Sequence, residues 1–506
     1  IDRLNLLRRH IKRMSSGTVT KKGRKTLYAV IVAVIVIAGA IGAAYWYTRP
    51  TTKTIYFYTW WATGGKVALN HTIVAFEASH PGFKVEPMLK PGAAGLNARG
   101  AILALMKAGT PPNTFQSLSG PQILSYVEAA PQGASSFVNM TPVAQSMGIT
   151  RAAFPEVLQA LEFNGTAFSL PITLHESGIL YFNPQVLKKY NLPIPVNYAL
   201  LVYDVKALEK AGEPAFMIPG ADGGYDQLEL WDSLFLMNGN ATIYNELTYG
   251  TLNLNNPVIQ QIINVTNDEF CFLVNNSYTG ETSMAWTQGL AGIIKGTAVF
   301  QVDVNSMTNY AYDFLDTVTY PVNSTYVNMQ TGQLLPAADN ITLMSEVFPG
   351  TTQYFILCQD TIAVPSGKVS TLGLNFAKYI SSWAGNTVFT KWKAATFYNN
   401  VTSDYFNTPD QWASYLHAKS LASTPSNWVI GYDVGGLFAD GQTTMESGIL
   451  ALQGKPTPSG IAAWNTVLKQ VDQEEYSDWM AAKSLGFGFM GTLSSPFGGY
   501  LPPWVT

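Results

Sequence analysis

The sequence predicts an α/β fold that follows a transmembrane helix near the amino end. Residues 54–59 form a β-branched and aromatic run, and Gly64 and Gly65 come just before a stretch with apolar residues at helical spacing. This order predicts a strand, a loop and a helix, which is the first unit of an α/β domain. Strand and helix patterns alternate from there on, and a length of 506 residues allows two or three domains.

The predicted transmembrane helix covers residues 26–47, a stretch of 22 residues without a charged side chain. At about 1.5 Å per residue this helix spans roughly 33 Å, enough to cross a bilayer. Residues 1–25 hold nine Lys and Arg but one acid. This bias predicts a cytoplasmic basic segment and places the chain after residue 49 outside the cell. The alternatives are a cleaved secretory signal and a prepilin-type cleavage within residues 22–25.

The elements of the large part are predicted from local patterns. Asn164 and Gly165 form the two-residue turn of a predicted hairpin over 163–168. Residues 186–298 are mainly helical, 306–350 are rich in loops, and the Gly-, Phe- and Pro-rich tail 481–506 is predicted to be an irregular covering or docking segment. The predicted strands are 54–59, 83–85, 114–118, 178–183, 297–302 and 354–364, with further helices around 69–76, 101–106, 376–383 and 388–392.

The charge distribution excludes one class of partner. The whole chain has a net charge of −3, but residues 26–506 hold 21 basic and 32 acidic side chains, a net charge of −11. No basic field is available there to collect phosphates, so nucleic acid is not an expected partner. Charged residues make up 12% of the chain, about half of the usual share of roughly 25%.

Sequons for N-glycosylation support an extracellular location. Nine Asn-x-Ser/Thr sequences occur after the predicted membrane segment and none before it. Such a one-sided distribution predicts an exported, glycosylated surface. The nine acceptor residues are Asn70, Asn139, Asn164, Asn240, Asn264, Asn275, Asn323, Asn340 and Asn400.

The cysteines and the sequence motifs give no indication of a catalytic or metal site. Cys271 and Cys358 are the two cysteines, and either a disulfide or two unpaired thiols is compatible with an extracellular chain. No spacing of His, Cys, Asp and Glu predicts a metal site, and no nucleophile, metalloprotease or phosphate-loop motif occurs. The sequence therefore predicts no metal, no cofactor and no catalytic residue.

Five short stretches then follow one another in a distinctive order. Residues 60–65 hold a Trp-Trp and a Gly-Gly pair, 109–116 read Gly-Thr-Pro-Pro-Asn-Thr-Phe-Gln, and 170–175 read Leu-Pro-Ile-Thr-Leu-His. Residues 296–303 read Gly-Thr-Ala-Val-Phe-Gln-Val-Asp, and 349–352 read Pro-Gly-Thr-Thr. In this order they resemble the extracellular sugar-binding proteins of ABC importers, solute-binding protein family 1, and especially the archaeal and bacterial glucose-binding group.

The resemblance covers roughly residues 52–475 and has three departures. The glutamate that follows the glycine pair in the family is Lys66 here, a histidine beside the glutamine falls at Leu118, and a histidine near the carboxyl end falls around 434–435. These changes affect the identity of the sugar rather than the class of protein.

The resemblance implies a two-lobed fold of the periplasmic-binding-protein type II. One lobe would comprise 52–168 plus 357–400, and the other 169–356 plus 401–480. The implied function is a membrane-anchored extracellular protein that captures glucose or a similar monosaccharide and delivers it to the permease subunits of an ABC transporter. It implies no enzymatic activity.

Two other functions remain open from the sequence. A surface glycoside hydrolase would need two carboxylates about 5–10 Å apart across the scissile bond, and Asp303 and Asp360 are the available pair. A structural or adhesive surface glycoprotein would favour repeats and long β patterns, which the sequence lacks.

The candidate sugar-binding residues combine indole rings with hydrogen-bonding side chains. Trp60 and Trp61 end the first strand, where ligands of α/β sheets bind. Gln116 offers both a donor and an acceptor, and carboxylates make strong hydrogen bonds to hydroxyls. Several positions are carried over from the family. The full set is Trp60, Trp61, Gln116, His175, Trp231, Trp286, Asp303, Asp360 and Lys393.

Overall fold

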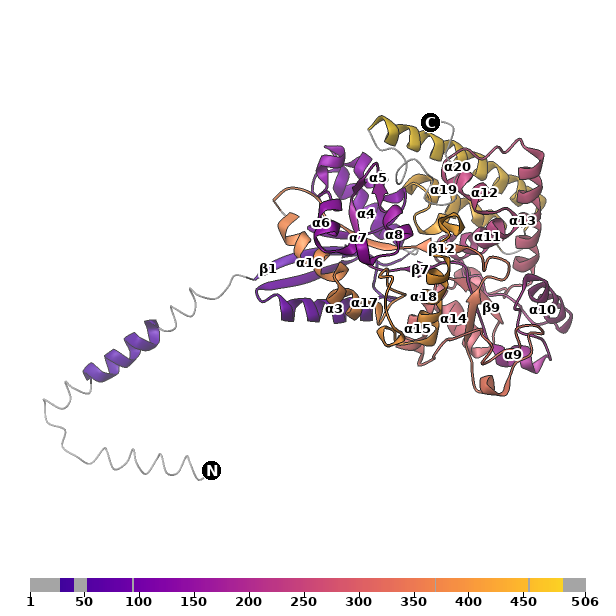
Figure 1. Cartoon of the computed structure of the whole chain (residues 1–506), viewed down its shortest axis with the longest axis horizontal. Helices are drawn as coiled ribbons and strands as arrows, with labels where there is room; N and C mark the ends of the chain where they lie inside the picture. The colour runs from indigo at the N-terminus through magenta and orange to yellow at the C-terminus, as the bar shows by residue number, and fades with distance from the viewer. Residues whose placement is uncertain (1–27, 41–51, 93–94, 369, 454–455, 486–506) are drawn as a thin grey trace, which may run out of the picture. The chain divides into compact units, whose positions relative to one another are not determined.

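The computed structural model describes residues 28–40, 52–92, 95–368, 370–453 and 456–485 (Figure 1). They fall into two units, 1–53 and 54–506. In the first unit, residues 28–40 form an exposed helix. The predicted basic segment 1–25, the ends of the predicted membrane helix and residues 486–506 of the predicted tail lie outside the described residues. The tail is predicted to be irregular from residue 481, but residues 481–484 still belong to the last described helix, α20 (Pro458–Ser484). Within the described ranges, every helix falls short of the length or the apolar character that a membrane span needs.

A five-stranded sheet organises the first half of the large unit. Its strands run in the order β2-β1-β3-β13-β6, with β1 and β3 parallel and β13 antiparallel to both β3 and β6. The predicted strands 83–85 and 114–118 and the first strand are confirmed. The bounds are β1 (Lys53–Thr59), β2 (Phe83–Leu89), β3 (Thr114–Leu118), β6 (Ser169–Pro171) and β13 (Asp360–Ala363).

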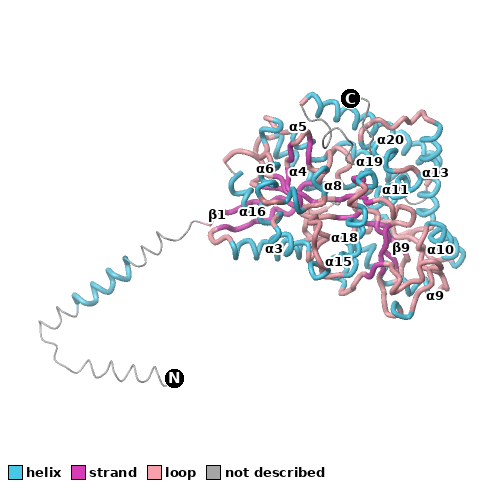
Figure 2. The backbone as a smooth tube through the Cα atoms, viewed as in Figure 1, coloured by secondary structure: helices cyan, strands magenta, loops and turns pink. Residues whose placement is uncertain are grey.

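Helices from distant parts of the chain cover this sheet. Phe57 of β1 and Phe76 of the first helix each contact Phe376 edge-to-face, with ring centroids 5.4 Å apart, so residues some 300 positions apart share one core. Figure 2 shows α3 and α16 beside these strands. The covering helices are α3 (Lys66–Ser79), α4 (Leu96–Lys107), α5 (Gln122–Ala129), α16 (Ser370–Ser381) and α17 (Trp383–Thr390).

A four-stranded sheet organises the second half, in the order β10-β11-β8-β9. A separate hydrophobic core lies against it, built largely from α11 and α13. The predicted strand 178–183 is confirmed as β8, whereas the strand predicted over 297–302 begins at Phe300 and includes Asp303. The bounds are β8 (Ile179–Phe182), β9 (Phe300–Asp303), β10 (Tyr320–Pro321), β11 (Met344–Val347), α11 (Tyr225–Asn238), α13 (Pro257–Asn275) and α14 (Trp286–Lys295).

A small third sheet, β14-β12-β7, lies where the chain passes between the two halves. The single strand predicted over 354–364 is in fact two strands separated at Gln359, β12 (Phe355–Cys358) in this small sheet and β13 in the five-stranded sheet. Each strand is buried throughout, so the pattern of side chains does not mark the change of sheet. The neighbours of β12 are β7 (His175–Glu176) and β14 (Trp428–Ile430).

The remaining predictions of local structure agree closely with the fold. The hairpin 163–168 is confirmed as β4 (Glu162–Phe163) and β5 (Thr166–Ala167), with positive φ angles of 51° and 76° at Asn164 and Gly165. The mainly helical stretch 186–298 is confirmed, but α15 was not predicted within the loop-rich region. Further helices are α6 (Thr141–Ser146), α7 (Ile149–Ala152), α8 (Pro155–Gln159), α9 (Pro184–Lys189), α10 (Tyr198–Ala211), α12 (Ala241–Thr248), α15 (Met307–Leu315), α18 (Pro409–Leu421), α19 (Ala439–Ile449) and α20 (Pro458–Ser484).

Trp231 lies at the centre of the second core. Its ring stacks on Phe235 at 4.9 Å and meets Trp464 edge-on at 5.2 Å. Its indole Nε1 donates a hydrogen bond of 2.9 Å to Oδ1 of Asn267. The side chain is fully buried and satisfied, so its role here is to pack α11 against α13 and α20.

We predict that Trp231→Ala lowers the free energy of unfolding by about 3–5 kcal/mol, because it leaves a cavity and removes the partner of Oδ1 of Asn267. Trp383→Ala, at a tryptophan that is 51% exposed, is the matched control and should cost about 1 kcal/mol or less. Chemical denaturation of the full chain measures both. Equal losses for the two variants would contradict this description of the second core.

Candidate functional site

A cavity of about 280 Å³ lies where the two halves of the large unit meet. One side comes from the loop after β1, from β7 and from the start of β13. The other side comes from α11, the start of α14, the end of β9 and the short helix η7 (Tyr432–Val434). The β1 loop contacts α14 directly, since a Cβ on Gly64 would lie 3.2 Å from the ring of Trp286.

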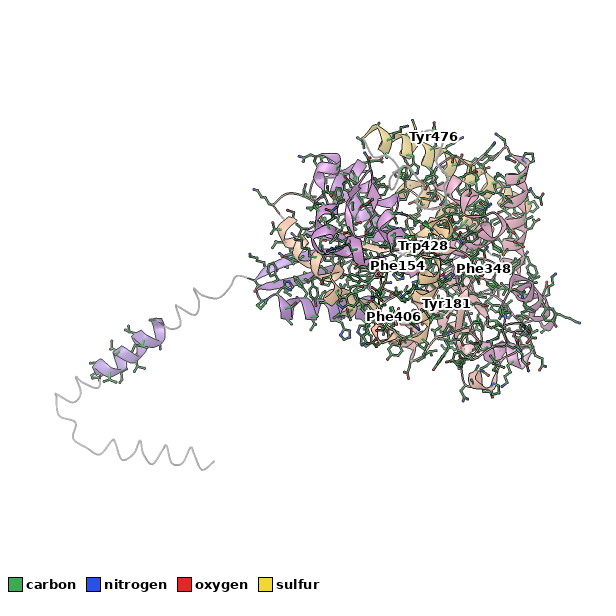
Figure 3. All side chains as sticks on the ribbon, viewed as in Figure 1. Phe154, Tyr181, Phe348, Phe406, Trp428 and Tyr476 are labelled. Atoms are coloured by element: carbon green, nitrogen blue, oxygen red, sulfur yellow. The ribbon has the colours of Figure 1, made fainter. Side chains whose placement is uncertain are left out.

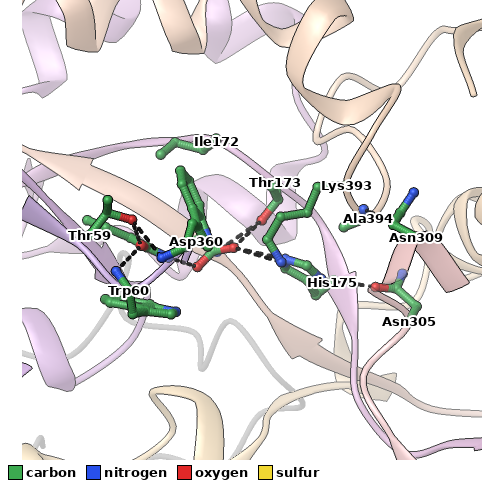
Figure 4. A network of polar contacts seen from close by, with 12 residues as sticks. Thr59, Trp60, Ile172, Thr173, His175, Asn305, Asn309, Asp360, Lys393 and Ala394 are labelled. Carbon is green, nitrogen blue, oxygen red and sulfur yellow. Dashed lines mark hydrogen bonds and ion pairs between the residues drawn. The ribbon is translucent and has the colours of Figure 1, made fainter. Parts of the chain in front are cut away.

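Asp360 is the polar centre of this cavity. Its Oδ1 accepts a 2.6 Å hydrogen bond from Nε2 of Gln116, and its Oδ2 lies 2.9 Å from Nε2 of His175 (Figure 4). Oδ2 also accepts from Oγ1 of Thr173 at 3.3 Å and lies 3.8 Å from Nζ of Lys393. These partners come from three segments of the chain, and Asp360 itself lies on a fourth, so one carboxylate joins four segments.

These contacts set the protonation state of the centre. Burial raises the pKa of Asp360, but Lys393 and the hydrogen bonds more than offset this, so its pKa lies below the ordinary value. Burial and Lys393 lower the pKa of His175 against the opposing effect of Asp360. Burial also lowers the pKa of Lys393, again opposed by Asp360. The centre is therefore a carboxylate whose charge is balanced by an adjacent lysine.

Gln116 is not itself part of the cavity wall. Its Oε1 accepts hydrogen bonds from Oγ1 of Thr59 at 2.5 Å and from the backbone N–H of Trp60 at 3.3 Å, while its Nε2 donates to Asp360 (Figure 4). Gln116 thus holds the end of β1 at a fixed distance from the carboxylate. The prediction of direct contact with a ligand remains untested.

Lys393 reaches the cavity through a tight turn. The next residue, Ala394, has a positive φ of 57°, and its backbone N–H donates a 2.6 Å hydrogen bond to Oδ1 of Asn309. Gly65 has a φ of 86°, and a Cβ there would lie 2.7 Å from Cδ of Lys393. A glycine is required at position 65 for both reasons, conformation and close approach.

Indole rings form the apolar part of the wall. Trp60 and Trp286 are half-buried and line the cavity from opposite sides. Trp61 also lines it but is 1% exposed, because it packs on Phe389 with centroids 4.7 Å apart. The Nε1 of Trp61 has no hydrogen-bond partner among the described residues, so the wall offers one unused donor.

Carboxyl groups form the wall on the other side. Asp222 accepts a 2.7 Å hydrogen bond from the N–H of Trp286, and Oδ1 of Asp303 accepts one of 2.7 Å from the N–H of Val304. Within the described residues, Oδ2 of Asp303 and both carboxyl oxygens of Asp433 have no partner. Burial raises the pKa values of all three carboxyls above their ordinary range. This wall therefore combines carboxyl oxygens that have no partner with carboxyls whose pKa values burial raises.

The structure brings seven of the nine predicted site residues to the cavity wall and an eighth, Gln116, to the centre behind it. Trp231 is the exception, because every residue of α11 from 225 to 236 is buried and position 231 faces the second core. The seven are Trp60, Trp61, His175, Trp286, Asp303, Asp360 and Lys393.

Sequence reasoning missed Asp222, Tyr225 and Asp433, which also line the cavity. They lie in loops and at helix ends without a recognisable motif. A signal existed for Asp433, because it directly precedes the position where the family's histidine is missing. Two of the departures noted in the sequence, Leu118 and Val434, both line the cavity as apolar side chains.

The sequon asparagines lie mainly at the surface. Eight of the nine are exposed, and Asn323 is half-buried. Several also begin helices or turns, as Asn240 does by accepting from the N–H of Ile243 at 3.0 Å.

Comparisons with known proteins agree with this architecture. The model of the bacterial extracellular solute-binding protein family matches residues 65–340. The glucose-binding protein GlcS of Saccharolobus solfataricus is 41% identical over 453 residues, which cover 89% of this chain and 79% of that protein. The chain belongs to the extracellular solute-binding protein family.

Solved structures share the fold at low sequence identity. The bacterial solute receptor AcbH aligns with a TM-score of 0.66 and 14% identity, over 84% of this chain and all (100%) of that chain. A chitin oligosaccharide binding protein aligns with a TM-score of 0.60 and 16% identity, over 80% and 95% of the two chains. The two-lobed α/β prediction is confirmed by these matches.

We predict that the chain is most stable in acid. Asp226, Glu229, Asp232, Asp303 and Asp433 are buried together, and burial raises the pKa of each, to about 8 for Asp232. The folded chain therefore holds protons that the unfolded chain releases near pH 4, so the free energy of unfolding should fall as the pH rises from about 4 to about 8.

Thermal unfolding of Asp433→Asn across this pH range tests the prediction. Removing one of these protons should reduce the slope by up to about 1.4 kcal/mol per pH unit. Asp339→Asn, at an exposed position, is the control. A wild-type chain whose stability rises between pH 4 and 8 would refute the interpretation.

Proposed function

We propose that this family member is the extracellular receptor of an ABC importer and that it binds glucose or a similar neutral monosaccharide in the cavity around Asp360. The observation that carries the proposal is the combination of indole rings on both sides with unused polar atoms. A pyranose is apolar on its faces and carries hydroxyls on its rim, which suits that wall. The relative from Saccharolobus solfataricus is named as a glucose-binding protein.

The proposed capture mechanism is closure of two lobes over the sugar. Lobes of 52–168 plus 357–400 and of 169–356 plus 401–480 would meet at the cavity, and a ligand that contacts both would favour the closed form. Two separate hydrophobic cores support this division. Tyr415 and Trp428, however, belong to the first core, and the rings of Phe154 and Trp428 lie 6.2 Å apart (Figure 3). We therefore propose that the chain passes from the first lobe to the second for the last time after α18, and not at residue 401.

The location proposed for this receptor is the outer face of the cell membrane. Residues 26–47 would anchor the chain and residues 1–25 would stay in the cytoplasm. Nine sequons after that segment, eight of them exposed, support glycosylation of the external part. The loaded, closed form would then dock on the permease subunits.

We infer that the sugar leaves unchanged. The pair Asp303 and Asp360 could suit a glycoside hydrolase, in which a protonated acid works with an ionised partner. Asp360, however, has both oxygens engaged by Gln116, Thr173 and His175. A carboxylate held in this way is a poor nucleophile, which supports a binding role.

We predict that Asp360→Asn weakens sugar binding by about 10–100-fold, because hydrogen bonds to a charged group contribute about 1.5–3 kcal/mol. Trp286→Ala should weaken it about 10-fold through loss of ring packing. Tryptophan fluorescence titration with a sugar panel measures both, with Trp383→Ala as control, and product analysis runs alongside. Sugar turnover would favour the hydrolase, and no response to any sugar would favour the structural glycoprotein.

Charge should decide between related sugars. Among the described residues that line the cavity, Lys393 is the only lysine or arginine, and it already faces Asp360. A carboxylate on the ligand would find no free cation, so the loss of its hydration on entering the cavity would not be compensated. We predict that glucuronate binds at least 100-fold more weakly than glucose, about 2.7 kcal/mol, in competition titrations. Equal affinities for glucuronate and glucose would contradict the conclusion that the described residues of the cavity wall leave no cation free to bind a carboxylate.

A further inference from the structure

Strand β7 carries two neighbouring polar side chains that face different cavities. Successive residues of a strand point to opposite faces. His175 lines the cavity around Asp360, whereas Glu176 lines a second cavity of about 250 Å³ together with Ser414 and His417 of α18. Both side chains are buried, with exposed fractions of 2% and 1%.

A continuous line of hydrogen bonds connects the two side chains. Nδ1 of His175 lies 3.1 Å from Oδ1 of Asn305, and Nδ2 of Asn305 donates to Oγ of Ser414 at 3.0 Å (Figure 4 shows the first of these). Oγ of Ser414 donates in turn to Oε2 of Glu176 at 2.8 Å. The backbone N–H of Asn305 also donates to the carbonyl of Glu176 at 2.8 Å, so its main chain is fixed beside β7.

The far end of this line is a charged histidine. Nδ1 of His417 contacts Oε1 of Glu176, and its Nε2 lies 2.8 Å from the carbonyl oxygen of Thr352. Both partners only accept, so both ring nitrogens must carry protons. Burial opposes this charge, but Glu176 raises the pKa of His417 to about 9. His417 is therefore an imidazolium ion that pairs with Glu176.

At the end of the line near Asp360, two protonation states of His175 satisfy the donors and acceptors of Asn305 and Ser414. In the first, Asn305 presents Oδ1 to His175, so His175 donates from both nitrogens and is charged, and Ser414 donates to Glu176. In the second, the amide of Asn305 is turned over and donates to a neutral His175. Ser414, with one proton, must then donate to Asn305 and release Glu176. The two amide orientations occupy nearly the same space.

We propose that Asn305, Ser414 and Glu176 are positioning residues of the ligand cavity, and that the orientation of the Asn305 amide sets whether Asp360 faces a charged or a neutral His175. The line of side chains acts as a two-state element that extends from the cavity to the pair Glu176–His417, in which Glu176 is buried and His417 is half-buried. This inference rests on the proposed function only for its last step, the effect on ligand affinity.

The surroundings of His175 determine the pH at which this histidine becomes charged. Burial and the charge of Lys393 lower its pKa below the ordinary value of 6.5, against the pull of Asp360, so the charged state forms on the acid side of that value. When it forms, Asp360 faces two cations and attracts ligand hydroxyls less strongly. The titratable or charged groups that face this centre are Cys358 of β12, Asp303 of β9, Asp360 of β13, Lys393 after α17 and Asp433 of η7.

Two substitutions should move the titration of His175 in opposite directions. Ser414→Ala removes two hydrogen bonds from the charged state and one from the neutral state, so the pKa of His175 should fall by roughly one unit. Asn305→Asp offers only acceptors to His175, so its pKa should rise by roughly one unit or more. The Ser414→Ala shift is the diagnostic one, because a carboxylate at position 305 raises the pKa of His175 by its charge alone, with or without the line of hydrogen bonds.

The experiment is an imidazole nitrogen NMR titration of the ligand-free, histidine-labelled full chain. The chain has five histidines, and the signal that His175→Gln removes identifies the residue. Ser420→Ala is the matched control, because Ser420 is an exposed serine on the same helix that bonds within it, to the carbonyl of His417. Its His175 titration should equal that of the wild type.

Each result decides the proposal. A lower His175 pKa in Ser414→Ala, with Ser420→Ala unchanged, supports the relay, and an unchanged His175 titration in Ser414→Ala overturns it. If Ser414→Ala does not fold, Glu176→Gln replaces it, since its amide donates to Ser414 and so favours the neutral state. Sugar titrations are separate, so an absent sugar response with intact NMR shifts would refute the proposed function and leave the relay standing.

Discussion

The buried charge of Asp360 is the constraint on which the rest of the site depends. A carboxylate that is 3% exposed is costly unless hydrogen bonds and an opposite charge surround it. Gln116, Thr173, His175 and Lys393 supply them. They come from three segments, and Asp360 lies on a fourth. Packing errors in any of these segments would leave the charge unpaired, so the carboxylate makes the arrangement of four segments mutually dependent.

This dependence explains why the centre lies where the chain changes sheets. The passage from β12 to β13 and the passage from β6 to β7 run side by side, and Asp360 and Thr173 lie within them. A crossing segment contributes to both halves of the unit and belongs wholly to neither. Groups placed there respond to the relative position of the halves, and groups deep in either core do not.

The two faces of the cavity use polar atoms differently. Around the Asp360 carboxylate, donors and acceptors are matched and a charge is retained. On the side of α11 and η7, Asp303 and Asp433 keep unused oxygens, and burial raises their pKa values. Polar atoms that already have partners are held in fixed positions. Buried polar atoms without partners gain hydrogen bonds when a ligand brings hydroxyl groups, and this gain favours binding. Strand β7 then links the matched face to Glu176 and His417 through Asn305 and Ser414.

By itself the sequence determined the α/β class and most of the local elements, because these follow from short patterns of side chains. It also indicated seven residues of one cavity wall, because motifs at these chain positions are shared within a family. Tertiary structure alone decided three things. Trp231 packs in a core, since an all-buried helix gives no pattern that separates a core face from a cavity face. Residues 354–364 divide between two sheets, since both strands are buried throughout. Asp222, Tyr225 and Asp433 join the wall because contacts between segments distant in the chain bring them there, and no local pattern records such contacts.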